Sequence, residues 1–283
     1  MKKSSLLLLA ALFLTGVFVY ASYRYFEIEQ ASIAEANRFQ ELAELMYQSG
    51  GEAKQTAQTP ASAEASAPTS VPNASNVPTP SGTGAEQTTE PPAFEPDAGL
   101  RRLHEMNSDL WGWITISGTA VDYPIMFTPD DPEFYLRRDF DKQDSRSGVP
   151  FLDGNCTEES DNLILYGHNM NDGSMFAALA DYRDKDYYKA HRLITLKTLT
   201  FEAQYEVFSV FLANANSGFR YYESLAFSDE SDFQAYIQSL EQLSLYSTGT
   251  TAVYGDKLLT LSTCSYHVTD GRLVVVAKQV NHS

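Results

Sequence analysis

Cysteine is scarce in this chain of 283 residues, which contains only Cys156 and Cys264. Small domains held together by disulfides use more cysteines in a shorter chain, so the sequence excludes that class of fold. Basic residues are also few: 20 Lys and Arg stand against 37 Asp and Glu and leave a formal net charge of -17. Since phosphate binding needs a basic surface, we predict no nucleic-acid partner. The acidic residues form no loop with the spacing of metal ligands, so we predict no metal ion and no other cofactor.

One long apolar run lies near the N-terminus, between residues 6 and 20, and two lysines precede it. With the small residues on either side it reaches about 19 residues, which is enough for a helix to cross a bilayer. No A-x-A cleavage site follows, so a retained anchor is favoured over a cleaved signal peptide. The positive-inside rule keeps the lysines in the cytoplasm. We therefore expect a cytoplasmic N-terminus at residues 1–4, a single-pass anchor in the cell membrane at residues 5–22, and an extracellular remainder.

Residues 50–94 are nearly free of large apolar residues and rich in Ala, Ser, Thr and Pro. Such a segment cannot bury enough surface to offset the entropy of ordering it, so we expect a flexible tether. As a coil it would span roughly 35 Å and hold the following domain away from the lipid. An imperfect apolar face predicts a juxtamembrane helix over residues 23–49, before the tether. Residues 95–283 form the predicted folded domain.

Within that domain, eight short runs are rich in β-branched and aromatic residues and are mostly bounded by turn-forming residues, which predicts strands. They are Trp111–Ser117, Ala120–Met126, Gly148–Leu152, Leu163–Tyr166, Leu193–Lys197, Gln204–Ala213, Lys257–Cys264 and Arg272–Val280. Eight closely spaced strands favour a closed or nearly closed β-barrel. Helices are predicted at Asp97–Asn107, Asp184–His191 and Asp229–Leu243, and the last lies between the sixth and seventh strands.

Cys264 closes an apolar strand that ends in a small polar cluster. A strand end beside a loop suits a nucleophile, because the strand fixes the side chain while the loop admits substrate. From this segment alone, a buried core cysteine is an equally weighted alternative. A disulfide with Cys156 is less favoured, because the surroundings of Cys264 look reactive. We expect Cys156 to be an exposed loop thiol.

Two further strand boundaries carry residues that could assist a thiol. His168 follows the strand Leu163–Tyr166 after one glycine, and Arg272 opens the last strand. If the last strand pairs antiparallel with the strand of Cys264, Arg272 lies close to the thiol. A free cysteine has a pKa of about 8.5, so forming the thiolate needs a base or nearby positive charge. His168 could accept that proton and return it to a leaving amine, while Arg272 could donate hydrogen bonds to an oxyanion.

The other four histidines are weaker candidates. His267, three residues after Cys264, is a rival for the role of base. The remaining three lie in helical or terminal contexts, where a histidine is more often structural or exposed: His104, His191 and His282. Because any enzyme could scatter a Cys, a His and an Arg along its chain, spacing alone is a weak signal.

Several motifs in a fixed order give the sequence a specific resemblance to a known family. They are Asn107–Ile114, Val121–Ile125, Tyr166–Met170, Asp172–Phe176 and Thr260–Cys264, and Arg272 follows on the last strand. With these motifs the chain resembles the sortases, and among them class B, from about residue 107 to residue 278. The resemblance implies a mainly β fold, with an eight-stranded closed sortase barrel, an N-terminal helix and a helix inserted between strands 6 and 7.

The resemblance also implies roles for individual residues. It implies that His168, Cys264 and Arg272 are the catalytic residues. It further implies four substrate-binding residues, of which the first matches an active-site serine and the second a substrate-contacting tyrosine: Ser262, Tyr222, Asn169 and Thr263. The helix at Asp229–Leu243 matches the class B insertion, which in the family helps to bind the sorting motif.

The reaction that the resemblance implies is transpeptidation. Cys264 would attack the carbonyl of a threonine in a C-terminal sorting motif, and an amine of peptidoglycan or lipid II would resolve the thioacyl intermediate. The product is a surface protein joined to the cell wall of a Gram-positive bacterium. Three alternatives stay open: a pilus-assembly sortase, a cysteine hydrolase of the same fold and a non-catalytic adhesin domain. The pilus enzyme is disfavoured, because no second apolar run precedes Ser283.

Overall fold

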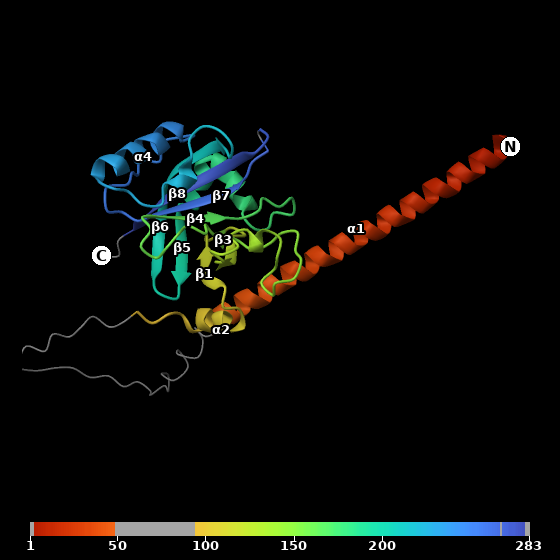
Figure 1. Ribbon diagram of the computed structural model, residues 1–283, viewed down its shortest axis with the longest axis horizontal. Coiled ribbons are helices and arrows are strands. Elements are labelled where there is room, and N and C mark those ends of the chain that lie inside the picture. Colours follow the sequence, from red (N-terminus) through yellow and green to blue (C-terminus); the bar gives the residue numbers. More distant parts are fainter. Residues whose placement is uncertain (1–2, 49–93, 267, 281–283) are drawn as a thin grey trace, which may run out of the picture.

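The computed structural model describes residues 3–48, 94–266 and 268–280, and it places side chains from residue 11 onward (Figure 1). A barrel holds the strands, and one long helix projects from it. Residues 50–93 of the predicted tether lie outside the described residues. His267 and His282 also lie outside them.

Eight strands form the barrel: β1 (Leu110–Thr115), β2 (Asp122–Met126), β3 (Phe151–Leu152), β4 (Asn162–Tyr166), β5 (Leu193–Thr198), β6 (Glu202–Asn214), β7 (Leu258–Cys264) and β8 (Gly271–Val280). They are hydrogen-bonded in the order β1-β2-β3-β4-β7-β8-β6-β5, and pairing of β5 with β1 closes the sheet. The β2–β3 and β4–β7 pairs are parallel, and the other pairs are antiparallel. The predicted eight-stranded closed barrel is confirmed.

Apolar side chains fill the barrel and also cover part of its outer surface. On β5, burial alternates as expected for a strand with one wet face. On β7, by contrast, every residue is buried except Cys264, the last one. The second face of β7 is covered because α4 (Glu230–Leu243) adds an apolar cluster on the outside of the barrel, where Phe233, Ile237 and Leu240 join Leu258. Burial on both faces holds β7 firmly up to the residue where it ends.

The helix α4 lies between β6 and β7 in the chain, as the sequence predicts. It begins at an aspartate cap, since the side chain of Asp229 accepts a hydrogen bond from the backbone N–H of Asp232 at 3.0 Å. The other two predicted helices are also present, as α2 (Ala98–Met106) and α3 (Lys185–Ala190), and each follows an aspartate cap of the same kind.

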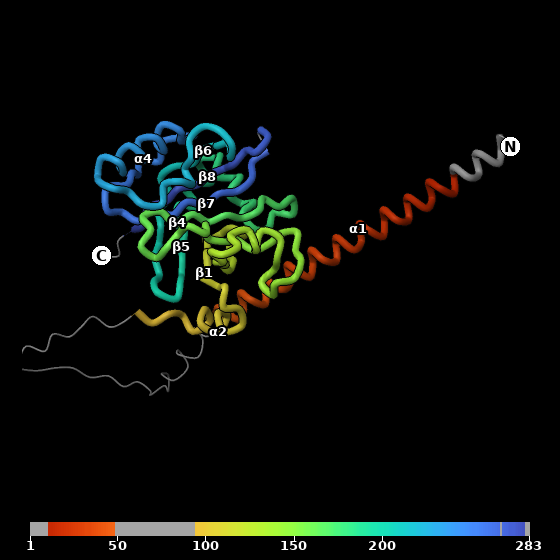
Figure 2. The backbone as a smooth tube through the Cα atoms, in the orientation of Figure 1, coloured from red at the N-terminus to blue at the C-terminus, as the bar shows by residue number. Residues whose placement is uncertain are grey.

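The predicted juxtamembrane helix is part of a longer helix, α1 (Lys3–Gln48), which Figures 1 and 2 show projecting from the barrel. Its C-terminal end packs on the folded domain. There Leu42 and Met46 are buried, and the ring of Phe39 meets the ring of Tyr123 edge-on at a centroid distance of 5.4 Å. The helix that precedes the predicted tether is therefore already in contact with the barrel.

None of the helices in the described part of the chain has an apolar stretch long enough to cross a membrane. The apolar run behind the predicted anchor begins at residue 6, whereas the described side chains begin at residue 11. The anchor at residues 5–22 stays a prediction.

Candidate active site

Two strands that end at the same edge of the barrel position His168 and Cys264. β4 and β7 are parallel neighbours, with Tyr166 opposite Ser262. Because parallel strands run in one direction, their carboxyl ends meet at one edge of the sheet, and the residues there share one region of space. β8 runs antiparallel to β7 and places Arg272 opposite Cys264, as the sequence predicts.

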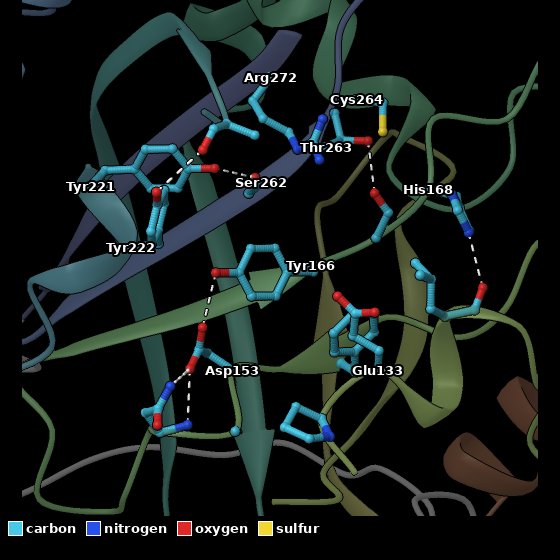
Figure 3. A pocket seen from close by; sticks show the side chains of 17 residues that line it. Glu133, Asp153, Tyr166, His168, Tyr221, Tyr222, Ser262, Thr263, Cys264 and Arg272 are labelled. Atoms are coloured by element: carbon cyan, nitrogen blue, oxygen red, sulfur yellow. Dashed lines mark hydrogen bonds between the residues drawn. The ribbon is translucent and has the colours of Figure 1, made fainter. Parts of the chain in front are cut away.

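His168, Cys264 and Arg272 line one cavity of about 380 Å³. In the view of Figure 3, Cys264 lies between Arg272 and His168. The lining also includes aliphatic, aromatic, polar and acidic side chains, among them Leu136, Phe151, Tyr166, Tyr221, Tyr222, Ser262, Thr263, Glu133 and Asp153. The structure thus brings together the three residues that could carry nucleophilic chemistry.

Hydrogen bonds from side chain to backbone join the two strand ends. The hydroxyl of Thr263 donates to the carbonyl oxygen of Gly167 at 2.8 Å, and the amide of Asn169 donates to the carbonyl oxygen of Cys264 at 2.9 Å. Packing requires glycine at position 167, because a Cβ on Gly167 would lie 2.6 Å from the ring of Phe176. Asn169 and Thr263 are predicted to bind substrate. Their side chains bond to the backbone at the ends of β4 and β7.

His168 is held by a hydrogen bond from its Nε2 to the backbone carbonyl oxygen of Leu136, at 3.0 Å. A carbonyl oxygen only accepts, so Nε2 carries the proton, and in the neutral ring Nδ1 is left as the acceptor. Burial lowers the pKa of His168 below its ordinary value; the bond to Leu136 opposes this shift, and the charge of Arg137 adds to it. The neutral, proton-accepting form is favoured.

Ser262 is paired with Tyr221, since their hydroxyl oxygens lie 2.7 Å apart and both residues are buried. Tyr221 belongs to the segment between β6 and β7, so this contact ties the inserted segment to β7. Tyr222 also lines the cavity, and its hydroxyl donates to the carbonyl oxygen of Ala215 at 3.2 Å. Sequence reasoning missed Tyr221, because nothing in a Tyr-Tyr pair tells which ring turns inward.

Two acidic residues of the cavity were also missed. Asp153 accepts a hydrogen bond from the hydroxyl of Tyr166 at 2.9 Å, and Glu133 lines the same wall. In Figure 3 both acids lie beyond Tyr166, on the side away from Arg272. Burial and the nearby carboxylate raise the pKa of Tyr166, so its hydroxyl stays a donor. No sequence signal pointed to these acids, because only closure of the barrel brings their segments to Cys264.

The prediction that Cys156 is an exposed loop thiol is wrong. Its side chain is 2% exposed, and its sulfur lies 3.8 Å from the carbonyl oxygen of Asn162. Burial raises the pKa of Cys156 to about 11, so the thiol stays protonated at neutral pH. The polar surroundings misled the prediction: a turn after β3, in which the backbone N–H of Cys156 donates to the carbonyl oxygen of Asp153 at 3.0 Å, returns this side chain to the core. Both cysteines are free.

The other described histidines lie outside this cavity. Nδ1 of His104 bonds to the carbonyl oxygen of Leu110 at 2.9 Å, and Nδ1 of His191 bonds to that of Ser117 at 2.8 Å. Each ring thus links two segments of backbone.

A thiol, an imidazole and a guanidinium in one cavity at the edge of a closed barrel can carry out cysteine-dependent acyl transfer. The chain belongs to the sortase family: residues 114–280, more than half of its length, match the sortase domain. It is 36% identical to sortase B of Listeria monocytogenes over 185 residues, which cover 64% of this chain and 74% of that protein. Against sortase B of Staphylococcus aureus the identity is 31%, with the same coverage.

Solved structures give the same assignment. The complex of S. aureus sortase B with substrate superposes with a TM-score of 0.61 at 30% identity, over 67% of this chain and 88% of that one. Sortase B of Clostridium perfringens superposes with a TM-score of 0.59 at 33% identity, over 64% of this chain and 99% of that one. These relatives confirm the predicted class B, and the enzyme is a sortase-type cysteine transpeptidase.

Proposed function

We propose that this sortase joins surface proteins with a C-terminal sorting motif to an amine of peptidoglycan or lipid II. Cys264 is the nucleophile, His168 the acid and base, and Arg272 the oxyanion donor. One observation carries the proposal: Cys264 shares a cavity with His168 and lies opposite Arg272, whereas Cys156 is buried. A relative, sortase B of S. aureus, has been solved as a substrate complex, which supports binding of a substrate by this fold.

The first half of the reaction forms a thioacyl enzyme. The sulfur of Cys264 attacks the carbonyl carbon of the motif threonine, and the thiol proton passes to His168. The carbonyl oxygen gains negative charge, which the guanidinium of Arg272 stabilises by hydrogen bonds. When the C–N bond breaks, His168 returns its proton to the leaving amine. The fragment after threonine departs, and the carbonyl carbon stays bonded to sulfur.

The second half transfers the acyl group to the wall. A neutral amine attacks the thioacyl carbon, and Arg272 again stabilises the oxyanion. His168 accepts a proton from the attacking nitrogen, the C–S bond breaks, and the proton returns to the sulfur of Cys264. A new amide bond replaces the one that was cut, so the step needs neither oxidant nor external energy source.

The four residues predicted to bind substrate fall into two pairs. Tyr222 and Ser262 line the cavity, so they can shape the site for the motif. Asn169 and Thr263, of which Thr263 also lines the cavity, bond to the backbone of the two strand ends and act by holding Cys264 and His168 in place. The prediction from the sequence gave all four residues one role, substrate binding, and the proposal adds a positioning role for two of them.

We place the enzyme at the outer face of the cell membrane, attached by residues 5–22. The apolar run from residue 6 to residue 20 and the two lysines before it support this orientation. Both reactants of the proposed reaction, a surface protein and a wall precursor, occur on that side of the membrane.

A cleavage assay on the full chain in detergent micelles tests the chemistry. The enzyme is incubated with a library of sorting-motif peptides, with and without a diamino acid or a glycine peptide, and the products are read by mass spectrometry. We expect cleavage after threonine and an amide product when the amine is present. Cys264→Ala should abolish both, while Cys156→Ala, the matched cysteine variant, should retain them.

Two results would contradict the proposal. Cleavage by Cys264→Ala at the wild-type rate would remove Cys264 from the mechanism. A free carboxylate as the sole product, even with amine in excess, would make the enzyme a cysteine hydrolase.

A further inference from the structure

The last third of α1 is bound to the barrel by polar as well as apolar contacts. The guanidinium of Arg38 donates to both carboxylate oxygens of Asp141, at 2.7 and 2.8 Å. Three further pairs extend these contacts along the helix: Tyr47–Asp122, Glu35–Ser147 and Ser32–Asp172. Since the contacts run from residue 32 to residue 47, they fix the direction of the helix and not only its position.

The end of α1 also lies against the beginning of α2, with backbone touching backbone. A Cβ on Gly99 would lie 2.1 Å from the carbonyl oxygen of Met46, so only glycine permits this approach. The chain leaves α1 after residue 48 and is described again from residue 94, a few residues before Gly99. The two described segments that flank the predicted tether thus meet at Met46 and Gly99. The length of the tether therefore cannot set how far the barrel lies from α1.

Toward its other end, α1 exposes many large apolar side chains. Between residues 12 and 26 they are Leu12, Phe13, Leu14, Val17, Phe18, Val19, Tyr20, Tyr23, Tyr25 and Phe26. The charged residue of this stretch, Arg24, pairs with Glu27 at 2.9 Å. Consecutive positions point in different directions around a helix, so the apolar residues suit a surrounding lipid phase better than one partner face. The tyrosines toward the end of the stretch suit the headgroup layer.

Only a short stretch of helix separates this apolar part from the barrel. From Phe26 to Ser32, whose hydroxyl bonds to Asp172 of the folded domain, the helix rises by about 9 Å. A coil as long as the segment 50–94 would instead let the domain move over roughly 35 Å. The helix allows much less freedom than the tether would, and the two possibilities predict different heights above a membrane.

We propose that α1 is a rigid arm that holds the barrel close to a phospholipid surface, at a height set by the helix and not by residues 50–94. The proposal rests on the membrane attachment proposed above. It places Cys264 in a narrow layer over the lipid, where a lipid-linked amine also lies. The predicted role of residues 50–94 as the spacer between lipid and domain then falls to the arm.

Energy transfer between the barrel and labelled lipid headgroups tests the arm. The full chain, with a fluorescent amino acid in place of Arg146, an exposed residue next to Ser147, is reconstituted in phosphatidylcholine–phosphatidylglycerol vesicles. The same flexible insert of 12 Gly and Ser residues is placed either after Glu29, within the arm, or after Ser75. The insert has a mean span of about 20 Å. After Glu29 it should lower the transfer efficiency by roughly half; after Ser75 it should leave it unchanged, as should deletion of residues 55–88.

An equal loss with the insert after Ser75, or no loss with the insert after Glu29, would overturn the arm while leaving the membrane attachment intact. Failure of the full chain to bind the vesicles would overturn the attachment and the arm together. Peptide cleavage, measured for each variant in detergent, reports separately on the transpeptidase and confirms that the barrel is folded.

Discussion

The two thiols of this enzyme differ in their surroundings. Cys264 occupies the last position of β7, where burial ends and the cavity begins, whereas Cys156 is 2% exposed. The thiolate is the reactive form of cysteine, and burial raises the pKa of Cys156 to about 11. A cysteine held in this way is both inaccessible and protonated at neutral pH.

Thiol labelling should therefore separate the two residues. We expect iodoacetamide to add one group to the native enzyme at neutral pH, on Cys264, and a second on Cys156 only after unfolding in urea. Mass spectrometry of the intact protein and of its peptides measures both. The variant Cys264→Ala should take up no label while folded, and labelling of folded Cys156 at a comparable rate would contradict the argument.

The imidazole of His168 should titrate below the ordinary histidine value of about 6.5. Burial and the charge of Arg137 both disfavour the protonated ring, so the neutral base persists to lower pH. In a Cys264→Ala background, which removes coupling to the thiol, an NMR titration should give a midpoint below that value. The acid limb of kcat/KM in the wild-type enzyme should fall in the same range. Arg137→Gln should raise both the NMR midpoint and the pH of the acid limb. A midpoint above 6.5 for His168 with Arg137 in place would contradict this prediction.

At the scale of elements, the hydrogen bond between Tyr221 and Ser262 connects the β6–β7 insertion to β7. Both hydroxyls are buried, so removal of one leaves the other without its partner. Tyr221→Phe and Ser262→Ala should each lower the free energy of unfolding by about 1–3 kcal/mol.

A double-mutant cycle tests this pairing. The double variant should lose less than the sum of the single losses, because no orphaned hydroxyl remains, and urea unfolding measures all three. Tyr222→Phe, whose hydroxyl has a longer bond to Ala215, is the matched control and should cost less. Strictly additive losses would show that the contact contributes nothing.

The strands show which boundaries a pattern can predict. All eight predicted strands exist, because runs of β-branched and aromatic residues between turn residues mark them well. Several boundaries shift by two or three residues, and the third strand loses most of its predicted length: the prediction is Gly148–Leu152, and only Phe151–Leu152 pairs as a strand. Pro150 lacks a backbone N–H, and Gly148 has a φ of +59°, so neither residue favours an extended ladder.

At the scale of the whole molecule, α1 contributes to the core of the domain as well as to its placement. Phe39, Leu42 and Met46 belong to the same apolar cluster as the barrel interior. A fragment that begins at residue 95 should therefore be less stable than one that begins at residue 27. Burial of each such side chain contributes about 1.5–3 kcal/mol, so the loss should reach several kcal/mol.

Urea unfolding of the two fragments, followed by tryptophan fluorescence, measures the difference. Trp113 lies near this contact, since Tyr47 packs edge-on against it at 6.5 Å. A third fragment from residue 27 with Phe39→Ala should fall between the other two. Equal midpoints for all three would show that α1 adds no stability.

The sequence alone predicted the strands and the inserted helix, and its resemblance to the sortases predicted the class of enzyme and the three residues of the proposed chemistry. The strands and the helix follow from local patterns, because runs of β-branched and aromatic residues, the turn residues between them and an apolar helix face extend over a few residues at a time. Only the tertiary structure decided that Cys156 is buried, that Tyr221 is the tyrosine that pairs with Ser262, and that Leu136 sets the proton of His168. It also decided that α1 packs on the barrel, although residues 50–94 separate the two in the sequence. Each of these depends on contacts between segments far apart in the chain, which a local pattern does not encode.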